Sequence, residues 1–580
     1  MNELQKYFSP DAIKLAYYRV NCWQDRMVKD LLGLRAFNND LDINCKYLSE
    51  KILTGNYKPQ AGLKYYVPKP SKTQRTKTLL MVEDALVYQA IANKIAERAY
   101  SHVKEHDNFV FGSVLHPEVI KGIELLKEEE PVYFFFKFWR SLYQQFRDSI
   151  IKAIEIDKVK YKFETDITGF FDSIPHYNLL ITLSEEFQVE DEILDLLAEC
   201  LNKWSGTKER STPGVGIPQG PLPSFLLANL LLHSLDIDMV GDGVKYYRYM
   251  DDIHIYGYTE EELLDVLVRI DNYTKGNGLS INSKKTSIIK MDPDKEDETV
   301  KELKKVRLFS LYDDSDQTDI DLLMESPAKK PKVNKSKKLQ DSLNKMSEQD
   351  NVGDSIFNML KYETIEDPTE IQEYWKKTIG EVEVELTNSF LLEEAVLKIK
   401  EGVTDVDLIR LGVQYSSAIR ALVDLNVSVK PNDELLKYWL VGLTTFFWRA
   451  NSYSFTLSLY KDNQALKEKL TDLFLNHFKH YEWVRYQLLV SLSLTQKFTD
   501  QELRSCFFKC LKVETSVIVR MALYRLLISK TNDKQFFASV KKELSKEANE
   551  YLKWVVLDFI KNQKQYKEND TLLLIESIGI

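Results

Sequence analysis

Two sets of acidic residues stand out because each interrupts a run of apolar and aromatic residues. Asp166 follows a β-branched and aromatic run, and Asp251 with Asp252 separates two alternating apolar runs. A single Asp at a strand end is often only a turn former. Two adjacent carboxylates repel each other, however, and a fold that holds such a pair half-buried normally supplies a cation. The three residues are therefore candidate metal ligands.

Three such carboxylates suit phosphate transfer with two metal ions. Two Mg²⁺ ions about 4 Å apart activate a hydroxyl nucleophile and stabilise a leaving pyrophosphate during in-line displacement. Mg²⁺ prefers a few carboxylates together with substrate phosphates, and this set of residues offers that combination. We therefore predict a two-metal site at Asp166, Asp251 and Asp252.

The elements around these residues must bring them to one place. A strand that breaks at Gly169 leaves Asp166 at its end, where a carboxylate can face a ligand instead of the core. Residues 246–256 predict a hairpin with the other two acids at its tip. The wider segment 161–290 has short strands separated by Gly and Pro, which predicts a mixed sheet with covering helices.

A glycine- and proline-rich segment, residues 214–230, lies between the two acidic sets. It predicts a loop that enters an apolar helix at about Pro223, a favourable residue for a first helical turn. One interpretation is a simple connection between a loop and a helix. The other is that the glycines let the backbone approach a nucleotide while Gln219 touches its sugar or base.

The order of these motifs resembles the palm of reverse transcriptases, particularly bacterial enzymes related to those of group II introns and retrons. The motifs that carry the resemblance are TDITGFFDSI, GIPQGPLPSFLLANL, YMDD and GLSINSKKT. Upstream, VPKP followed by QR and EDALVYQ is similar to the fingers segment of that family, and NFVFG to its next motif. The resemblance covers about residues 60–290. It implies an α+β fingers–palm polymerase with the right-hand fold of reverse transcriptases.

The resemblance also implies roles for individual residues. It makes the enzyme an RNA-directed DNA polymerase that uses dNTPs and binds an RNA template, a DNA product or both. The metal, Mg²⁺ with Mn²⁺ as the alternative, would be held by Asp166, Asp251, Asp252 and the backbone carbonyl of Ile167. The nucleotide would be contacted by Lys69 and Arg75 at the triphosphate, Phe171 at the sugar 2′ position, Gln219, Gly220, and Lys285 near the pyrophosphate. The competing interpretations are surface charges for the cations and a core position for the Phe.

The composition and residue pattern of the chain divide it into regions. We predict fingers at residues 1–160, the palm at 161–300, a charged linker or insertion at 301–352 and an α-helical repeat domain at 353–580. The last region is almost free of Gly and Pro, and cap-like residues precede its apolar helix faces. Such residues occur at Thr499-Asp500, Thr515-Ser516 and Thr531-Asn532-Asp533. We find no fixed sequence period that proves a solenoid.

Composition sets further limits. A chain of 580 residues is too long for one ordinary core, so two or three domains are expected. No apolar stretch reaches the roughly 18 residues of a membrane span, and the N-terminus lacks the apolar core of a secretory signal, so we expect a cytoplasmic protein without membrane contact. A net charge of −10 gives no global sign of nucleic-acid binding, which must come from local patches.

The helical C-terminal region and the aromatic insertion at residues 133–140 are similar to those of the abortive-infection and defence-associated reverse transcriptases of bacteria, the unknown-group enzymes. That resemblance implies antiphage defence, a HEAT-like C-terminal domain that acts as a thumb or in oligomerisation, and synthesis that is template-independent and primed by a protein hydroxyl. One alternative is a retron or group II intron-derived enzyme that copies a dedicated RNA. The other is a catalytically silent RNA-binding scaffold.

Overall fold

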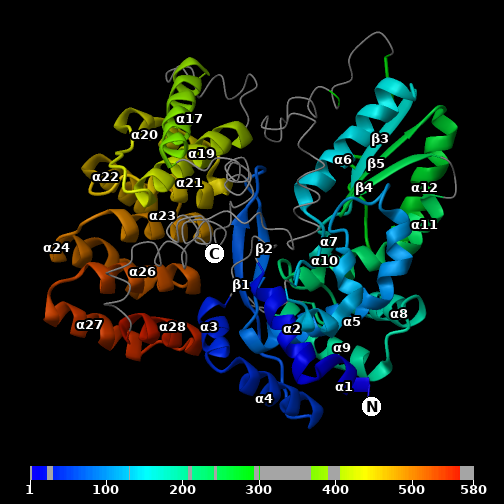
Figure 1. Ribbon diagram of the computed structural model, residues 1–580, viewed down its shortest axis with the longest axis horizontal. Coiled ribbons are helices and arrows are strands. Elements are labelled where there is room, and N and C mark those ends of the chain that lie inside the picture. Colours follow the sequence, from blue (N-terminus) through cyan, green and yellow to red (C-terminus); the bar gives the residue numbers. More distant parts are fainter. Residues whose placement is uncertain are drawn as a thin grey trace. The chain divides into compact units, whose positions relative to one another are not determined.

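The computed structural model describes residues 3–22, 30–129, 131–206, 212–240, 244–292, 300, 368–389 and 405–561. The charged segment expected at 301–352 lies outside these residues. Contacts divide the chain into two compact units, Met1–Lys64 with Lys77–Lys330 and Tyr65–Thr76 with Pro331–Ile580 (Figure 1). The chain therefore leaves the first unit after Lys64, contributes a short segment to the second and returns at Lys77. The boundary between fingers and palm stays a prediction.

The first unit combines helices with a small sheet. Its α-helices are α1 (Glu3–Phe8), α2 (Pro10–Asn21), α3 (Leu31–Asn39), α4 (Leu41–Leu53), α5 (Val82–Val103), α6 (Trp139–Ile151), α7 (Phe170–Ser173), α8 (His176–Glu185), α9 (Asp191–Ser205), α10 (Leu222–Leu231), α11 (His233–Val240) and α12 (Glu260–Gly276). Shorter 3₁₀ or π turns are η1 (Lys104–His106), η2 (Pro117–Lys127) and η3 (Lys152–Ile156). Helix α5 is buried along most of its length within the largest core cluster.

The sheet of this unit is antiparallel, with strand order β4-β5-β3-β6. The strands are β3 (Tyr161–Asp166), β4 (Lys245–Tyr249), β5 (Asp252–Gly257) and β6 (Ile289–Lys290). Successive side chains of a strand point to opposite faces. Tyr246 and Ile255 accordingly pack with α11 and α12, whereas Tyr247 and Tyr256 pack with α6. Both faces are covered, and the strand ends are left to carry polar groups.

The described residues of the second unit form helices and one hairpin. Its helices are α17 (Pro368–Ser389), α19 (Asp405–Asp424), α20 (Leu436–Thr445), α21 (Ala450–Leu457), α22 (Gln464–Asp472), α23 (Glu482–Thr495), α24 (Asp500–Glu502), α25 (Lys509–Val513), α26 (Val517–Lys530), α27 (Lys534–Ser545) and α28 (Glu550–Lys561), with η5 (Asp433–Leu435), η6 (Phe447–Arg449), η7 (Leu473–His477) and η8 (Leu503–Phe508). The hairpin is β1 (Leu63–Pro68) with β2 (Gln74–Leu79), and it contributes Tyr65–Thr76. None of the described helices is both long and apolar enough to cross a bilayer.

The helices of this unit repeat in pairs. Helices α17, α19, α21, α23, α26 and α28 pack on one another in chain order. The side chains of Asn463, Thr499 and Asp533 cap the helices that precede α23, α26 and α28, and these caps are 36 and 34 residues apart. In each of the three cap-like segments predicted from the sequence, one residue stands at a helix N-cap, namely Thr499, Ser516 and Asp533. An irregular period explains why no fixed repeat is visible in the sequence.

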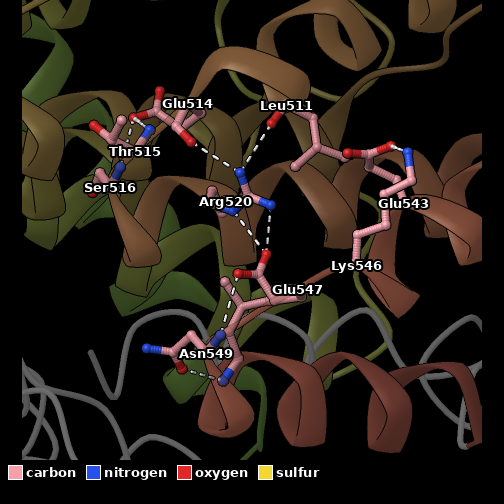
Figure 2. A network of polar contacts seen from close by, with 10 residues as sticks. Leu511, Glu514, Thr515, Ser516, Arg520, Glu543, Lys546, Glu547 and Asn549 are labelled. Atoms are coloured by element: carbon pink, nitrogen blue, oxygen red, sulfur yellow. Dashed lines mark hydrogen bonds and ion pairs between the residues drawn. The ribbon is translucent and has the colours of Figure 1, made fainter.

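Partly buried arginine–glutamate pairs join successive helix pairs. Arg485 contacts Glu514 at 2.6 Å, and Arg520 binds Glu547 through two nitrogens at 2.5 and 2.8 Å. Figure 2 shows that Arg520 also donates to the backbone carbonyls of Leu511 and Glu514, at 3.2 and 2.9 Å. The last carbonyls of a helix have no partner within it, so an Arg from the next helix can satisfy them. Arg520 thus joins α26 to the end of α25, which precedes it, and to Glu547, which follows α27.

Arg520→Ala is expected to lower the free energy of unfolding by about 3 kcal/mol, because the change leaves the carboxylate of Glu547, 9% exposed, without its partner. The matched control is Arg504→Ala, which removes a pair with Asp533 whose side chains are 44% and 36% exposed and should cost less than the Arg520 change. Urea unfolding followed by far-ultraviolet circular dichroism measures both. Equal losses for the two variants would show that burial of the Arg520 pair does not govern its contribution.

Candidate active site

The β3–β5 pairing places two of the predicted acids opposite each other. Asp166 ends β3 and Asp252 begins β5, and the two are direct partners across the antiparallel register. Asp251 lies in the turn between β4 and β5, and its carbonyl accepts the Ile167 N–H at 3.3 Å. The predicted hairpin is therefore confirmed, and the structure brings all three acids to one end of the sheet.

Two cationic or polar side chains lie against these acids. Lys285 Nζ is 3.4 Å from Asp166 Oδ2, which puts this predicted residue beside the acids. His254 Nε2 is 3.2 Å from Asp252 Oδ2 and its ring packs edge-on against Phe146. Burial, with the nearby Asp252 carboxylate adding to it, raises the pKa of Tyr143 on α6. These contacts lower the repulsion between the carboxylates.

The oxygens of this site suit a hard cation such as Mg²⁺. Asp166 Oδ1 is buried and has no hydrogen-bond partner among the described residues, which is an unfavourable state for a carboxylate oxygen in the absence of a cation. In the described ranges, no group of three or more His, Cys, Asp and Glu side chains is drawn together as a formed metal centre. The fit therefore rests on the chemistry of the oxygens and on the unpartnered Asp166 Oδ1.

The glycine-rich loop is fastened to the segment that follows Asp166. Ile217 N–H donates to the Phe171 carbonyl at 2.8 Å, and Gly216 N–H donates to the Ile174 carbonyl at 2.7 Å. Gly216 has φ +87°, and a Cβ there would lie 3.1 Å from the Asp172 carbonyl oxygen. Glycine is therefore required at Gly216 both for its conformation and for this close approach.

Phe171 and Gln219 belong to the two segments that these hydrogen bonds join, the segment after Asp166 and the glycine-rich loop. Phe171 is 7% exposed and packs edge-on against Phe225 of α10 at 5.2 Å, so its contact with a nucleotide sugar stays a prediction. The Gln219 carbonyl accepts the Thr78 N–H of β2 at 3.2 Å, and Gly220 has φ +141°. Helix α10 begins at Leu222 with Pro223 in its first turn, as the sequence predicts.

Two of the predicted site residues belong to the other compact unit. Lys69 and Arg75 belong to the hairpin segment Tyr65–Thr76, which is part of the second unit, whereas the other predicted site residues belong to the first. Lys69 N–H donates to the Thr73 carbonyl at 2.8 Å and closes the hairpin loop, and Arg75 is exposed. Their contact with a triphosphate stays a prediction.

Sequence reasoning missed the residues that hold the acidic turn from behind. Arg248 is fully buried, and its guanidinium donates to both Asp236 oxygens at 2.8 and 2.5 Å, to Asn229 Oδ1 at 2.9 Å and to the Met250 carbonyl at 2.8 Å. Burial is the largest single effect and lowers the pKa of Arg248, but Asp236 and Tyr246 together outweigh it and raise the pKa above the ordinary value. An Arg inside an otherwise apolar strand run, two residues before Met250, was the available signal.

The same turn explains a glycine of the NFVFG motif. Met250 has φ +59°, an uncommon backbone conformation for a residue with a side chain. A Cβ on Gly112 would lie 2.5 Å from the Met250 nitrogen, and Asn229 Nδ2 donates to the Gly112 carbonyl at 2.7 Å. Gly112, Asn229 and Arg248 thus hold a strained turn immediately before the adjacent acids.

Arg248→Lys is expected to weaken Mn²⁺ binding by about tenfold, because residues that hold metal ligands in place typically contribute about 10- to 100-fold in affinity. A lysine keeps the charge but cannot reach Asp236, Asn229 and the Met250 carbonyl together. Water-proton relaxation measures the affinity. Arg269→Lys, at a half-exposed ion pair with Asp238, is the control. Unchanged Mn²⁺ affinity in a folded Arg248→Lys protein would show that the contacts of Arg248 with the turn do not contribute to metal binding.

Part of the chain matches a known protein family. The family described as reverse transcriptase (RNA-dependent DNA polymerase) matches residues 67–319. A protein of Schizosaccharomyces pombe, the uncharacterized 91 kDa protein in cob intron, is 40% identical over 74 residues, which are 13% of this chain and only 9% of that protein.

Two solved structures are similar over longer stretches. Telomerase from Candida albicans, in complex with a fragment of telomeric RNA, has a TM-score of 0.30 at 12% identity over 77% of this chain and 70% of that one. Apo telomerase from Candida tropicalis also has a TM-score of 0.30, at 10% identity over 90% and 74%. Scores this low carry no argument about the fold. The family match therefore shows that residues 67–319 are similar to the reverse transcriptase (RNA-dependent DNA polymerase) family.

Proposed function

We propose that the chain is a reverse-transcriptase-type DNA polymerase that joins deoxynucleotides to a hydroxyl group. The observation that carries this proposal is the direct pairing of Asp166 with Asp252 at the end of the sheet, with Asp251 in the adjoining turn. Asp166 Oδ1, which is buried and has no hydrogen-bond partner among the described residues, supports a role in cation binding.

The proposed roles follow from the chemistry of each side chain. Asp166, Asp251, Asp252 and the Ile167 carbonyl would hold two Mg²⁺ ions, or Mn²⁺ in their place. When bound, the ions activate the attacking hydroxyl and stabilise the leaving pyrophosphate. Lys285, 3.4 Å from Asp166, would donate a proton to the pyrophosphate.

The remaining predicted residues would bind the nucleotide. Lys69 and Arg75 would contact the triphosphate, for which cationic side chains are apt ligands. Phe171 would exclude a sugar 2′-hydroxyl, and the backbone at Gln219 and Gly220 would approach the nucleotide. The bond from Thr78 N–H to the Gln219 carbonyl supports this role, because it ties the loop to β2, the strand that contains Arg75.

Changing Asp251→Asn together with Asp252→Asn should reduce Mg²⁺-dependent incorporation of dNTPs to background, because neutral amides do not hold the two cations. The fold should persist, since these residues lie in a turn and at the first position of β5. Primer extension with labelled dNTPs measures activity, and circular dichroism reports the fold. Incorporation at the wild-type rate by the folded double variant would exclude both residues from the mechanism.

Antiphage defence of the abortive-infection type is the biological role that we propose. The paired helices of the second unit support it, because a HEAT-like C-terminal region is what the resemblance to defence-associated enzymes implies. The alternative is an intron-related or retron enzyme that copies a dedicated RNA, and the short match to a protein in a fungal cob intron favours it.

Sequencing the nucleic acid that co-purifies with the protein separates these roles. One dedicated RNA would support the intron or retron role, whereas DNA without a matching template would support template-independent synthesis in defence. Priming on a protein hydroxyl is part of the defence proposal. It requires product that stays attached to the protein in denaturing detergent and is released by protease.

The helical unit is proposed to act as a HEAT-like, thumb-like element that retains the product. Residues 405–561 carry 23 Lys and Arg against 17 Asp and Glu, a surplus of six positive charges in a chain of net charge −10. A local positive surplus of this kind favours contact with phosphates. Assembly into a homo-oligomer is the alternative role for the same helices.

A chain that ends at residue 350 should lose product retention and make only short products, since it lacks this positive surplus. Primer extension under single-turnover conditions measures product length, and gel mobility shifts with the DNA product measure retention. Size-exclusion chromatography shows whether the shortened protein is monodisperse. Full-length product from a monodisperse shortened protein would contradict the thumb-like role and leave oligomerisation.

A further inference from the structure

The tip of the β1–β2 hairpin is bound by the start of α23. Tyr66 N–H donates to Glu482 Oε1 at 2.7 Å, and the Tyr481 hydroxyl donates to the Lys72 carbonyl at 3.2 Å. Both contacts use backbone groups of the hairpin, so they fix the position of the strand and of its loop whatever side chains these carry. Lys69 lies between the two contact points along the chain.

Aromatic packing reinforces the first contact. The Tyr65 ring lies 5.6 Å from the Trp483 ring, and Trp483 stacks on Tyr486 at 5.8 Å with an angle of 11° between the rings. Tyr65 is 2% exposed and Trp483 is 6% exposed. Aromatic pairs of this kind add to the stability that burial provides. Tyr65 therefore anchors β1 against α23 by a buried side chain, whereas residues 70–75 of the hairpin are exposed.

Glu482 is itself held by a third element. Its second oxygen, Oε2, accepts a hydrogen bond from the Ser516 hydroxyl, and Ser516 is the N-cap residue of α26. One carboxylate thus joins β1, α23 and α26. A hydrogen bond to an ionised acceptor is about twice as strong as a neutral one, so this carboxylate is an effective anchor for the Tyr66 backbone.

We propose that Glu482 is a positioning residue for the nucleotide, and that the helical unit sets the nucleotide affinity of the polymerase by holding the hairpin that carries Lys69 and Arg75. The proposal rests on the proposed function, since it takes these two cations as the triphosphate contacts. A cation held in place contributes more to binding than one that must be ordered when the ligand arrives, because the ordering entropy is already lost.

The test compares three variants of the full chain. Glu482→Ala removes both hydrogen bonds. Glu482→Gln keeps an oxygen for Tyr66 N–H and an amide that can donate to the Ser516 oxygen. Glu547→Ala is the matched control, because it breaks a partly buried ion pair to the same helix, α26, at Arg520 and does not contact the hairpin.

The expected kinetic result is a change in KM without an equal change in kcat. Glu482→Ala should raise the KM for dNTP about tenfold, the size of effect that loss of one charge-assisted hydrogen bond produces. Its kcat should change by less than about twofold, because a triphosphate contact made in the ground state affects binding and chemistry separately. Glu482→Gln should restore the wild-type KM, and Glu547→Ala should lower the melting temperature without altering KM.

Hydrogen exchange gives a second measurement that does not depend on activity. The Tyr66 amide should exchange faster in Glu482→Ala and remain protected in Glu482→Gln and Glu547→Ala. If the wild-type protein incorporates no nucleotide, the proposed function fails, and the Tyr66 amide still decides whether Glu482 holds the hairpin. Wild-type KM in Glu482→Ala together with faster Tyr66 exchange would overturn the link to nucleotide affinity, and unchanged exchange would overturn the anchor itself.

Discussion

Two carboxylates set opposite each other across the β3–β5 pairing impose a cost that the surrounding structure must offset. Like charges about 4 Å apart repel by about 1 kcal/mol in water and by about 4 kcal/mol near a protein surface. Lys285 lies against Asp166, and His254 against Asp252. Behind the turn, Arg248 holds the Met250 carbonyl with Asp236 as its counter-charge. Buried groups behind the turn thus hold the acidic residues in place.

In the second unit, many short helices pack together without a central sheet to order them. Each of the last helix pairs begins with a side-chain cap and is joined to the next by a partly buried Arg–Glu pair. Arg520 also satisfies carbonyls at the end of α25 while it pairs with Glu547, which follows α27. Local polar contacts therefore set the repeat, and apolar packing between α23, α26 and α28 supplies the bulk of the core.

Local patterns explain what the sequence predicted well. The end of β3 at Asp166, the hairpin around Asp251 and the caps at Thr499, Ser516 and Asp533 all depend on residues close together in the chain. Arg248 was missed because its partners Asp236 and Asn229 come from helices that only the fold brings near. The bond between Tyr66 and Glu482 joins residues 416 positions apart, which no local pattern encodes. Ligand roles for Lys69, Arg75 and Phe171 depend on a substrate and stay predictions.

The distance along the chain between Tyr66 and Glu482 has a consequence during synthesis of the protein. At about 5–20 residues per second, a ribosome needs roughly 20–80 s to make the 416 residues between the two partners. Throughout that interval Tyr65 and the edge of β1 lack the surface that covers them in the finished protein. An uncovered strand edge beside an apolar aromatic residue is prone to pair with other chains. The hairpin therefore stays open to such pairing until α23 emerges.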